Sequence, residues 1–365
     1  MKYQYISPST RSINPAVDLF IIPDHMPEVQ FLRSDKTLDN VRMEYFGKNT
    51  IVDLFSNQSL DYTNYFFVLD YVNLQDFDDC SFFYPDFFLK TVFDYQKYEP
   101  DYVIDFSKKQ YSVNCAMNKR RPPRYIASCW FYNNNIDGLQ YTQTWDCDDS
   151  DVLQTLNELF QLSKLVDWTH KYGPAIKMLD KKWIDYRNNG PECYKSAASN
   201  EENFFHNGVK TIFDTTAFSI VLEPVFWEHG SMITEKYVHA VYGGTIPLVN
   251  GYKIYDVLSQ LGFDTFSDII DTSSQYELDP VLRVWNMLEK NKNVFAQWKE
   301  LISDQRIQDR LINNLNLLKT PDVLFRNIIK LNTNDSRQKA ISFAQPLLDN
   351  KFLYADMLNV YIQNQ

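Results

Sequence analysis

The stretch FSIVLEPVFWEHGSMITEKYVHAVYGGTIPLVNG (218–251) places an acid beside a base at the start of a predicted helix. Its apolar ends predict two strands, Thr234 is a suitable N-cap, and a Gly-Gly pair ends the helix. A helix N-terminus that follows a parallel strand presents free N–H groups and a positive dipole to a phosphate. Lys236 adds charge there, and Glu235 can accept hydrogen bonds from sugar hydroxyls. The alternative is structural, with Glu235 complementing the dipole and Lys236 solvated at the surface.

The basic loop NKRRPPR (118–124) is a second candidate site, because it directly follows a strand predicted over residues 111–116. Three arginines in one loop repel one another unless an anion or nearby acids pair with them. Arg121 and Arg124 are therefore candidate ligands of an anionic group. The alternative is a surface basic loop whose partners are acids such as Asp105.

A third candidate is the run DCDDSD, in which Asp146 and Asp148 form a D-x-D pair. Such pairs hold a divalent metal on a nucleotide-sugar diphosphate in one class of transferase. The run also precedes an amphipathic helix predicted over residues 152–162, where Asp and Ser are common caps, and capping is the favoured interpretation. The five histidines show no ligand spacing, and the sequence contains no nucleophile elbow, Walker loop or G-x-G-x-x-G. We therefore expect neither a metal nor a resident cofactor.

The length of 365 residues exceeds what one hydrophobic core usually supports. Residues 1–106 contain short apolar strands broken by turns, which is typical of a small α/β domain. Strands alternate with helices over residues 107–274 and predict a mostly parallel sheet, whereas residues 275–365 have the apolar spacing of helices. The sequence thus predicts an α/β protein with two domains and a helical C-terminal segment.

Composition restricts the class of function. The net charge of −11 disfavours a protein whose main work is to neutralise a phosphate backbone. Five widely spaced cysteines without a C-x-x-C pair suggest reduced thiols and a cytoplasmic protein. The first residues lack an apolar signal segment, and no apolar run is long enough to span a bilayer, so we expect no membrane anchor.

The segment FSIVLE…MITEKYVHAVYGGTIPLVNG resembles the donor-site signature of the α1,3/α1,4-fucosyltransferases. The earlier segment VNCAMNKRRPPRYIASCWF is similar to the strand and loop that begin the donor domain of that family. The similarity covers residues 111–271, with a weaker one over residues 76–88. It implies two Rossmann-like domains of the GT-B type and an inverting reaction that requires no metal. It also implies a nucleotide-diphosphate sugar as co-substrate, with fucose as the default sugar.

The resemblance also suggests roles for individual residues. Arg124 matches the arginine that contacts the donor diphosphate, and Lys236 matches the lysine on the phosphates. Glu235 matches the carboxylate near the donor sugar or ribose. Glu223 stands at the first position of a Glu-Asn pair that helps to hold the donor, but Pro224 replaces the asparagine. This departure leaves the donor base and sugar open.

The catalytic base is a further departure from the family. The glutamate that serves as base in the family aligns with Leu74, and an aromatic residue at the donor site is replaced by Met232. Asp76 is the first candidate base because it lies two residues from the family's position, and Asp70 is the second. The alternative is that these acids only cap turns.

The sequence therefore predicts an inverting, metal-independent glycosyltransferase that uses a nucleotide-sugar donor and a glycan or other hydroxyl acceptor. A phage-type transferase acting on a DNA base is one alternative, although the acidic composition disfavours a nucleic-acid acceptor. A metal-dependent D-x-D transferase is another. The third is a degenerate transferase that binds a glycan without turnover, suggested by Leu74 and Pro224.

Overall fold

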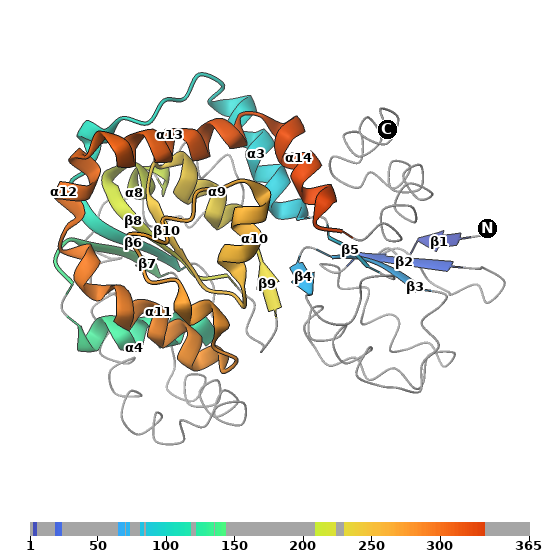
Figure 1. Cartoon of the computed structure of the whole chain (residues 1–365), viewed down its shortest axis with the longest axis horizontal. Helices are drawn as coiled ribbons and strands as arrows, with labels where there is room; N and C mark the ends of the chain where they lie inside the picture. Colours follow the sequence, from blue (N-terminus) through green and yellow to red (C-terminus); the bar gives the residue numbers. More distant parts are fainter. Residues whose placement is uncertain are drawn as a thin grey trace.

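The computed structural model describes residues 3–5, 19–23, 65–69, 71–73, 81–83, 85–117, 122–134, 136–143, 209–223 and 230–332. In these ranges the chain is an α/β protein with two parallel sheets and one short antiparallel strand pair (Figure 1). The larger sheet has the strand order β10-β8-β6-β7. Its strands are β6 (Tyr111–Met117), β7 (Leu139–Gln143), β8 (Thr216–Val221) and β10 (Ile246–Val249).

All strand pairs in the larger sheet are parallel, as the alternation of strands and helices predicts. Every residue of β8 and of β10 is buried. A parallel sheet with helices on both faces has no solvated side, so its strands are apolar runs without polar alternation. The side-chain nitrogen of the polar Asn114 of β6 is satisfied within the sheet, because it donates to Ser219 Oγ at 2.7 Å.

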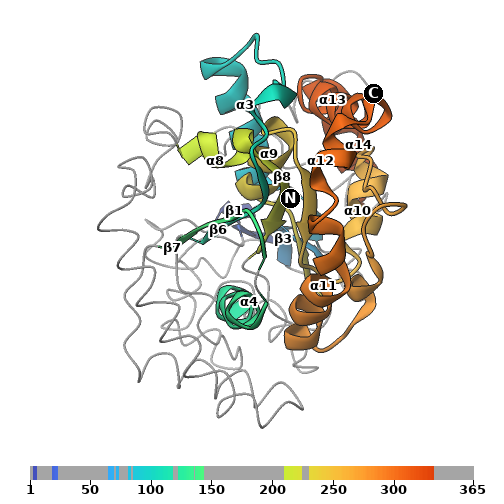
Figure 2. The same ribbon diagram turned by 90° about the vertical axis from the view of Figure 1, so that its left-hand side faces the viewer.

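Helices cover both faces of the larger sheet (Figures 1 and 2). On one face α4 (Pro122–Asn133) packs against α11 (Pro280–Phe295). On the opposite face lie α8 (Val209–Thr215) and α9 (Glu235–Tyr242). Two further helices pack on α9 from outside, namely α3 (Asp86–Tyr98) and α13 (Gln305–Leu318).

The predicted helical C-terminal segment is helical where the structure describes it, up to residue 332. Asp279 starts α11 because its carboxylate accepts hydrogen bonds from Val281 N and Leu282 N, and Pro280 occupies the first turn. The other helices are α10 (Ile254–Leu261), α12 (Trp298–Ser303), α14 (Pro321–Lys330) and the 3₁₀ helices Phe106–Lys108 and Ser273–Tyr276. Within the described ranges, no helix combines the length and apolar character needed to cross a bilayer.

The N-terminal strands form the second parallel sheet, with the order β1-β2-β3-β5. These are β1 (Tyr3–Tyr5), β2 (Leu19–Pro23), β3 (Tyr65–Leu69) and β5 (Ser81–Phe83). Between the two sheets, β4 (Tyr71–Asn73) pairs antiparallel with β9 (Gly230–Met232) (Figure 1). The side chain of Asn332, after α14, also accepts a hydrogen bond from Phe83 N at 2.6 Å. Among the described residues, the β4 and β9 pair and the Asn332 bond therefore join the N-terminal strands to the rest of the molecule.

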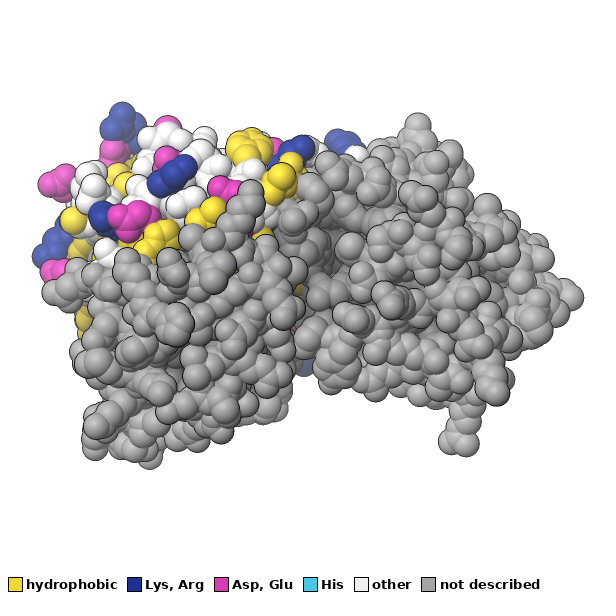
Figure 3. Space-filling view, turned by 90° about the horizontal axis from the view of Figure 1, so that it is seen from below, with side chains coloured by type: hydrophobic (Ala, Val, Ile, Leu, Met, Phe, Trp, Pro, Cys, Tyr) yellow, Lys and Arg dark blue, Asp and Glu magenta, His cyan; other side chains and the backbone are white. Residues whose placement is uncertain are grey.

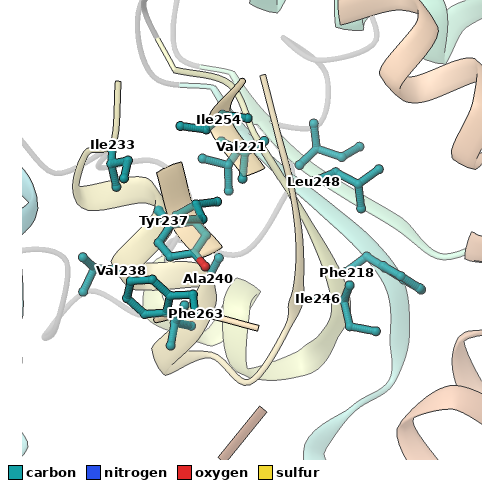
Figure 4. Packing of buried hydrophobic residues seen from close by; sticks show 14 of the residues in the cluster. Phe218, Val221, Ile233, Tyr237, Val238, Ala240, Ile246, Leu248, Ile254 and Phe263 are labelled. Carbon is teal, nitrogen blue, oxygen red and sulfur yellow. The ribbon is translucent and has the colours of Figure 1, made fainter. Parts of the chain in front are cut away.

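The helix α3 precedes residue 107, where the sequence predicts the domain boundary, and it packs on α9 of the larger sheet's helical layer. The Tyr95 ring stacks on the Tyr242 ring with centroids 3.7 Å apart, and Tyr95 Oη lies 3.2 Å from His239 Nδ1. Figure 4 shows the adjoining core, in which the rings of Tyr237 of α9 and of Phe263 pack in a T-shaped pair with centroids 5.1 Å apart. Buried aromatic pairs of this kind contribute about 0.5–1.5 kcal/mol to stability in addition to the effect of their buried apolar area.

A lysine that the sequence does not single out joins the elements at the amino edge of the larger sheet. Lys109 precedes β6, and its buried ammonium donates to the carbonyl oxygens of Phe213 at 3.2 Å, Thr216 at 2.6 Å and Gly243 at 2.5 Å. Because these carbonyls belong to the ends of α8 and α9 and the start of β8, one side chain holds all three together.

Candidate functional site

The candidate site lies at the carboxyl edge of the larger sheet, at the position where the connections between strands change from one face of the sheet to the other. The strand β6 lies between β7 and β8, and the helices α4 and α9 that follow β6 and β8 cover opposite faces. In open α/β sheets, ligands bind outside the carboxyl ends of the strands at such a switch point. The residues that follow β6 and β8 therefore determine the chemistry of this edge of the sheet.

The connection from β9 into α9 has the local structure that the sequence predicts. Thr234 is the N-cap in an extended conformation, and its side chain accepts a hydrogen bond from Lys236 N at 3.5 Å. The helix ends at the Gly-Gly pair, where Gly244 has φ of +63°. A Cβ at that position would lie 2.4 Å from Ile104 Cγ2, so both the backbone conformation and the close approach require glycine.

Lys236 lies between two carboxylates. Its ammonium is 2.7 Å from Glu235 Oε1 and 3.6 Å from Glu223 Oε2, and it donates to Thr234 Oγ1 at 3.0 Å. The Lys236 side chain is 17 % exposed and that of Glu235 is 38 % exposed, whereas Glu223 is completely buried. Lys236 is therefore paired and largely buried, in contrast to the alternative of a solvated surface lysine.

Glu223 is tied to its surroundings at both ends. Its carboxylate accepts hydrogen bonds from Thr234 N at 2.8 Å and from Thr234 Oγ1 at 2.6 Å. Its backbone N–H donates to Asn250 Oδ1 at 2.5 Å, and the Asn250 amide donates back to the Glu223 carbonyl at 3.3 Å. Asn250 directly follows β10, so the ends of β8 and β10 and the start of α9 are connected through one buried acid.

The two acids differ in their proton affinity. Burial raises the pKa of Glu223 above its usual range, and the charge of Lys236 only partly counteracts this effect. Burial also disfavours ionisation of Glu235, but the charge of Lys236 and its hydrogen bond outweigh burial and lower the pKa of Glu235 to about 2. Neighbouring acids whose pKa values are shifted in opposite directions are common in functional sites, and structural ion pairs show such shifts too.

Arg124 stands in the first turn of α4, directly after β6, and is 4 % exposed. Burial raises the pKa of the Cys115 thiol in β6 to about 12, and the positive charge of Arg124 lowers it by a smaller amount. Arg124 is therefore buried near the strand that borders β8 at the switch point. The neighbouring basic residue Arg121 lies outside the described residues.

The structure brings Glu223, Glu235 and Lys236 into one cluster. The candidate bases Asp70 and Asp76 fall outside the described ranges, as do the D-x-D residues Asp146 and Asp148. In the part of the chain that is described, no group of three His, Cys, Asp or Glu side chains could hold a metal ion.

Two contacts of this site have only weak signals in the sequence. Asn250 stands between a predicted strand and a glycine, a position where a side chain can cap a neighbouring strand end. The pairing of Tyr71 with Met232 and of Val72 with Ser231 brings β4 next to the strand that leads into Thr234. Strand pairing between segments so distant in the sequence has no local signal.

Comparisons with models of protein families, with curated proteins and with solved structures give no match to this chain. The function proposed below therefore rests on the geometry around Lys236 and on the sequence signature of residues 111–271.

Proposed function

We propose that the protein is an inverting, metal-independent glycosyltransferase. It moves a sugar, by default fucose, from a nucleotide-diphosphate donor to a hydroxyl group of a glycan or another acceptor. The observation that carries this proposal is the position of Lys236. Its ammonium lies in the first turn of α9, beside the end of β8 and next to the switch point of a parallel sheet.

The chemistry requires that the negative charge of the departing diphosphate is stabilised. Lys236 and the guanidinium of Arg124 supply preorganised positive charge for this purpose. Burial raises the pKa of Glu223 above its usual range, so this acid ionises less readily than Glu235. The carboxylate of Glu235 is the more exposed of the two acids and accepts hydrogen bonds from the sugar or ribose hydroxyls.

The architecture proposed with this activity has two Rossmann-like domains of the GT-B type. The described N-terminal strands support it, because they form a second sheet in which every pair is parallel. In such an architecture the acceptor side faces the donor side across the crevice. The β4 and β9 pair would then connect the two sides next to Thr234.

The donor site is tested by nucleotide binding. Lys236→Ala and Arg124→Ala should each weaken binding of guanosine diphosphate or uridine diphosphate by about tenfold or more, because charge-assisted hydrogen bonds contribute about 1.5–3 kcal/mol. Isothermal titration calorimetry measures both affinities. Lys299→Ala is the control, because it also removes one lysine charge but lies near the amino edge of the sheet, in a pocket that Phe106 and Lys109 also line. This variant should bind the nucleotides as tightly as the unsubstituted protein does. Unchanged affinity in both folded site variants would contradict the assignment.

The general base is tested separately. Inversion requires a group that takes the proton of the acceptor hydroxyl, and such bases contribute on the order of 10²–10⁴-fold. Asp76→Asn and Asp70→Asn are compared for transfer rate at saturating donor and for donor affinity. One of them should lose transfer while it retains donor binding. Full transfer rates in both would place the base elsewhere.

Three assays separate the proposal from its alternatives. Transfer that persists in excess chelator supports the metal-independent reaction, whereas loss that manganese restores would favour the D-x-D pair Asp146 and Asp148. Donor binding without hydrolysis or transfer would favour a degenerate binding protein. Transfer to DNA would favour the phage-type enzyme, although on the face shown in Figure 3 several of the described basic side chains lie beside acidic ones.

A further inference from the structure

We propose that Thr234 and Asn250 are positioning residues, which together fix the Lys236 ammonium for an anionic diphosphate through the carboxylate of Glu223. This inference rests on the proposed function and assigns new roles within the same site. From the sequence alone, Thr234 is expected only to cap a helix, and Asn250 is not assigned a role.

The first step is the direction of the Thr234 hydroxyl. Its oxygen accepts from the Lys236 ammonium, which can only donate, so its proton goes to Glu223 Oε2 at 2.6 Å. The lone pairs of Thr234 Oγ1 then face Lys236, which donates to this oxygen from Nζ at 3.0 Å and from the backbone N at 3.5 Å. Glu223 and Thr234 are both buried, so water does not compete for these contacts.

The second step is the placement of Glu223 itself. The buried amide of Asn250 bonds both the N–H and the carbonyl of Glu223, at 2.5 Å and 3.3 Å. The backbone N–H of Asn250 donates to Val221 O at 3.2 Å, which joins the same residue to the end of β8. Asn250 thus fixes the backbone from which the Glu223 carboxylate extends towards Thr234.

The third step is the effect on the ligand. A lysine side chain loses much rotamer freedom when it is held in one place, and that entropy is lost on binding unless the protein has already fixed the side chain. The contacts to Thr234, Glu223 and Glu235 hold the ammonium before any phosphate arrives. Removal of the Thr234 hydroxyl should therefore weaken diphosphate binding although no group that touches the ligand is lost.

The experiment uses substitutions that leave the charge of the site unchanged. Thr234→Val, Asn250→Leu and the double variant are titrated with guanosine diphosphate and uridine diphosphate. Each single variant should bind about tenfold more weakly, and the double variant should bind no more weakly than the weaker single one, because both residues act in one chain of contacts. Fully additive losses, or unchanged affinity in Thr234→Val, would overturn the proposal.

Two matched variants separate positioning from general loss of structure. Thr245→Val makes the same chemical change at a buried threonine that bonds Ser219 Oγ at 2.8 Å and the carbonyl of Ala240 at 2.9 Å. It should lower stability and leave the affinity unchanged. Thr234→Ser keeps the hydroxyl and should restore binding. If Asn250→Leu does not fold, the contrast between Thr234→Val and Thr234→Ser decides.

A measurement without ligand distinguishes failure of this inference from failure of the proposed function. The ¹⁵N resonance of the Lys236 ammonium, assigned by its loss in Lys236→Arg, should shift in Thr234→Val and Asn250→Leu and stay in place in Thr245→Val. An unmoved signal in the first two variants overturns the positioning role. If the signal shifts but the unsubstituted protein binds neither diphosphate, the positioning role holds and the proposed donor function fails.

Discussion

Replacement of Lys109 by methionine tests how the buried lysine contributes to the fold. Methionine fills a similar volume but cannot donate, so the carbonyls of Phe213, Thr216 and Gly243 lose a shared partner. Each buried carbonyl left unsatisfied costs about 1–3 kcal/mol. Removal of a buried charge offsets part of this loss, because the ammonium is costly to desolvate.

The pH dependence decides between these opposing effects. Burial lowers the pKa of Lys109 to about 7, with a smaller contribution from the charge of Lys210 and an opposing one from Asp214. In the unfolded chain the pKa is about 10.4, so the unfolded state binds more protons over the interval between the two values. The stability that Lys109 contributes therefore increases as the pH rises, by about 2.5 kcal/mol between about pH 6 and about pH 9.

We therefore expect Lys109→Met to be less stable than the unsubstituted protein by about 2–5 kcal/mol at about pH 9, with a smaller deficit at about pH 6. Urea unfolding followed by tryptophan fluorescence measures the difference at each pH. Lys108→Met is the control, because Lys108 is 59 % exposed and 3.9 Å from Asp105, and its effect should stay within about 0.5 kcal/mol. A deficit that is constant across this pH interval would refute the reasoning, since it would mean that the three carbonyls keep Lys109 charged in the folded state.

Three further predictions concern other parts of the molecule. Val72→Cys with Ser231→Cys should form a disulfide on oxidation, detected by mass spectrometry, because these residues lie directly opposite in the β4 and β9 pair. Tyr71→Cys with Ser231→Cys should not, since neighbouring side chains of a strand point to opposite faces. Asn332→Leu should lower the free energy of unfolding by about 1–3 kcal/mol, because it removes the acceptor of a buried N–H in β5, and an unchanged urea midpoint would contradict this role. For Glu235→Gln, whose wild-type carboxyl has a pKa lowered to about 2, the loss of stability should be present above about pH 4.3 and disappear as the pH falls towards 2, as thermal unfolding at several pH values can show.

The local structure around the site is determined by the sequence alone. An apolar run, a threonine cap, a helix of periodic apolar residues and a Gly-Gly end predict β8, α9 and β10, which the structure shows, whereas β9 lies where the sequence predicts a loop. The signals suffice because capping bonds and the positive φ of Gly244 involve residues only a few positions apart. The mostly parallel sheet is likewise predicted, because strands alternate with helices along this part of the chain.

Only the tertiary structure determines how the charged groups of the site meet. Asn250 bonds Glu223 across 27 residues of sequence, and the carboxylate of Glu223 bonds Thr234 across 11. The packing of α3 on α9 joins Tyr95 to His239 across 144 residues. Each contact depends on the order of the strands and on the packing of the helices. Both result from many weak interactions between residues that are distant in the sequence. The burial that raises the pKa of Glu223 and lowers that of Lys109 follows from the same packing, because the cost of desolvating a charge depends on every atom that surrounds it.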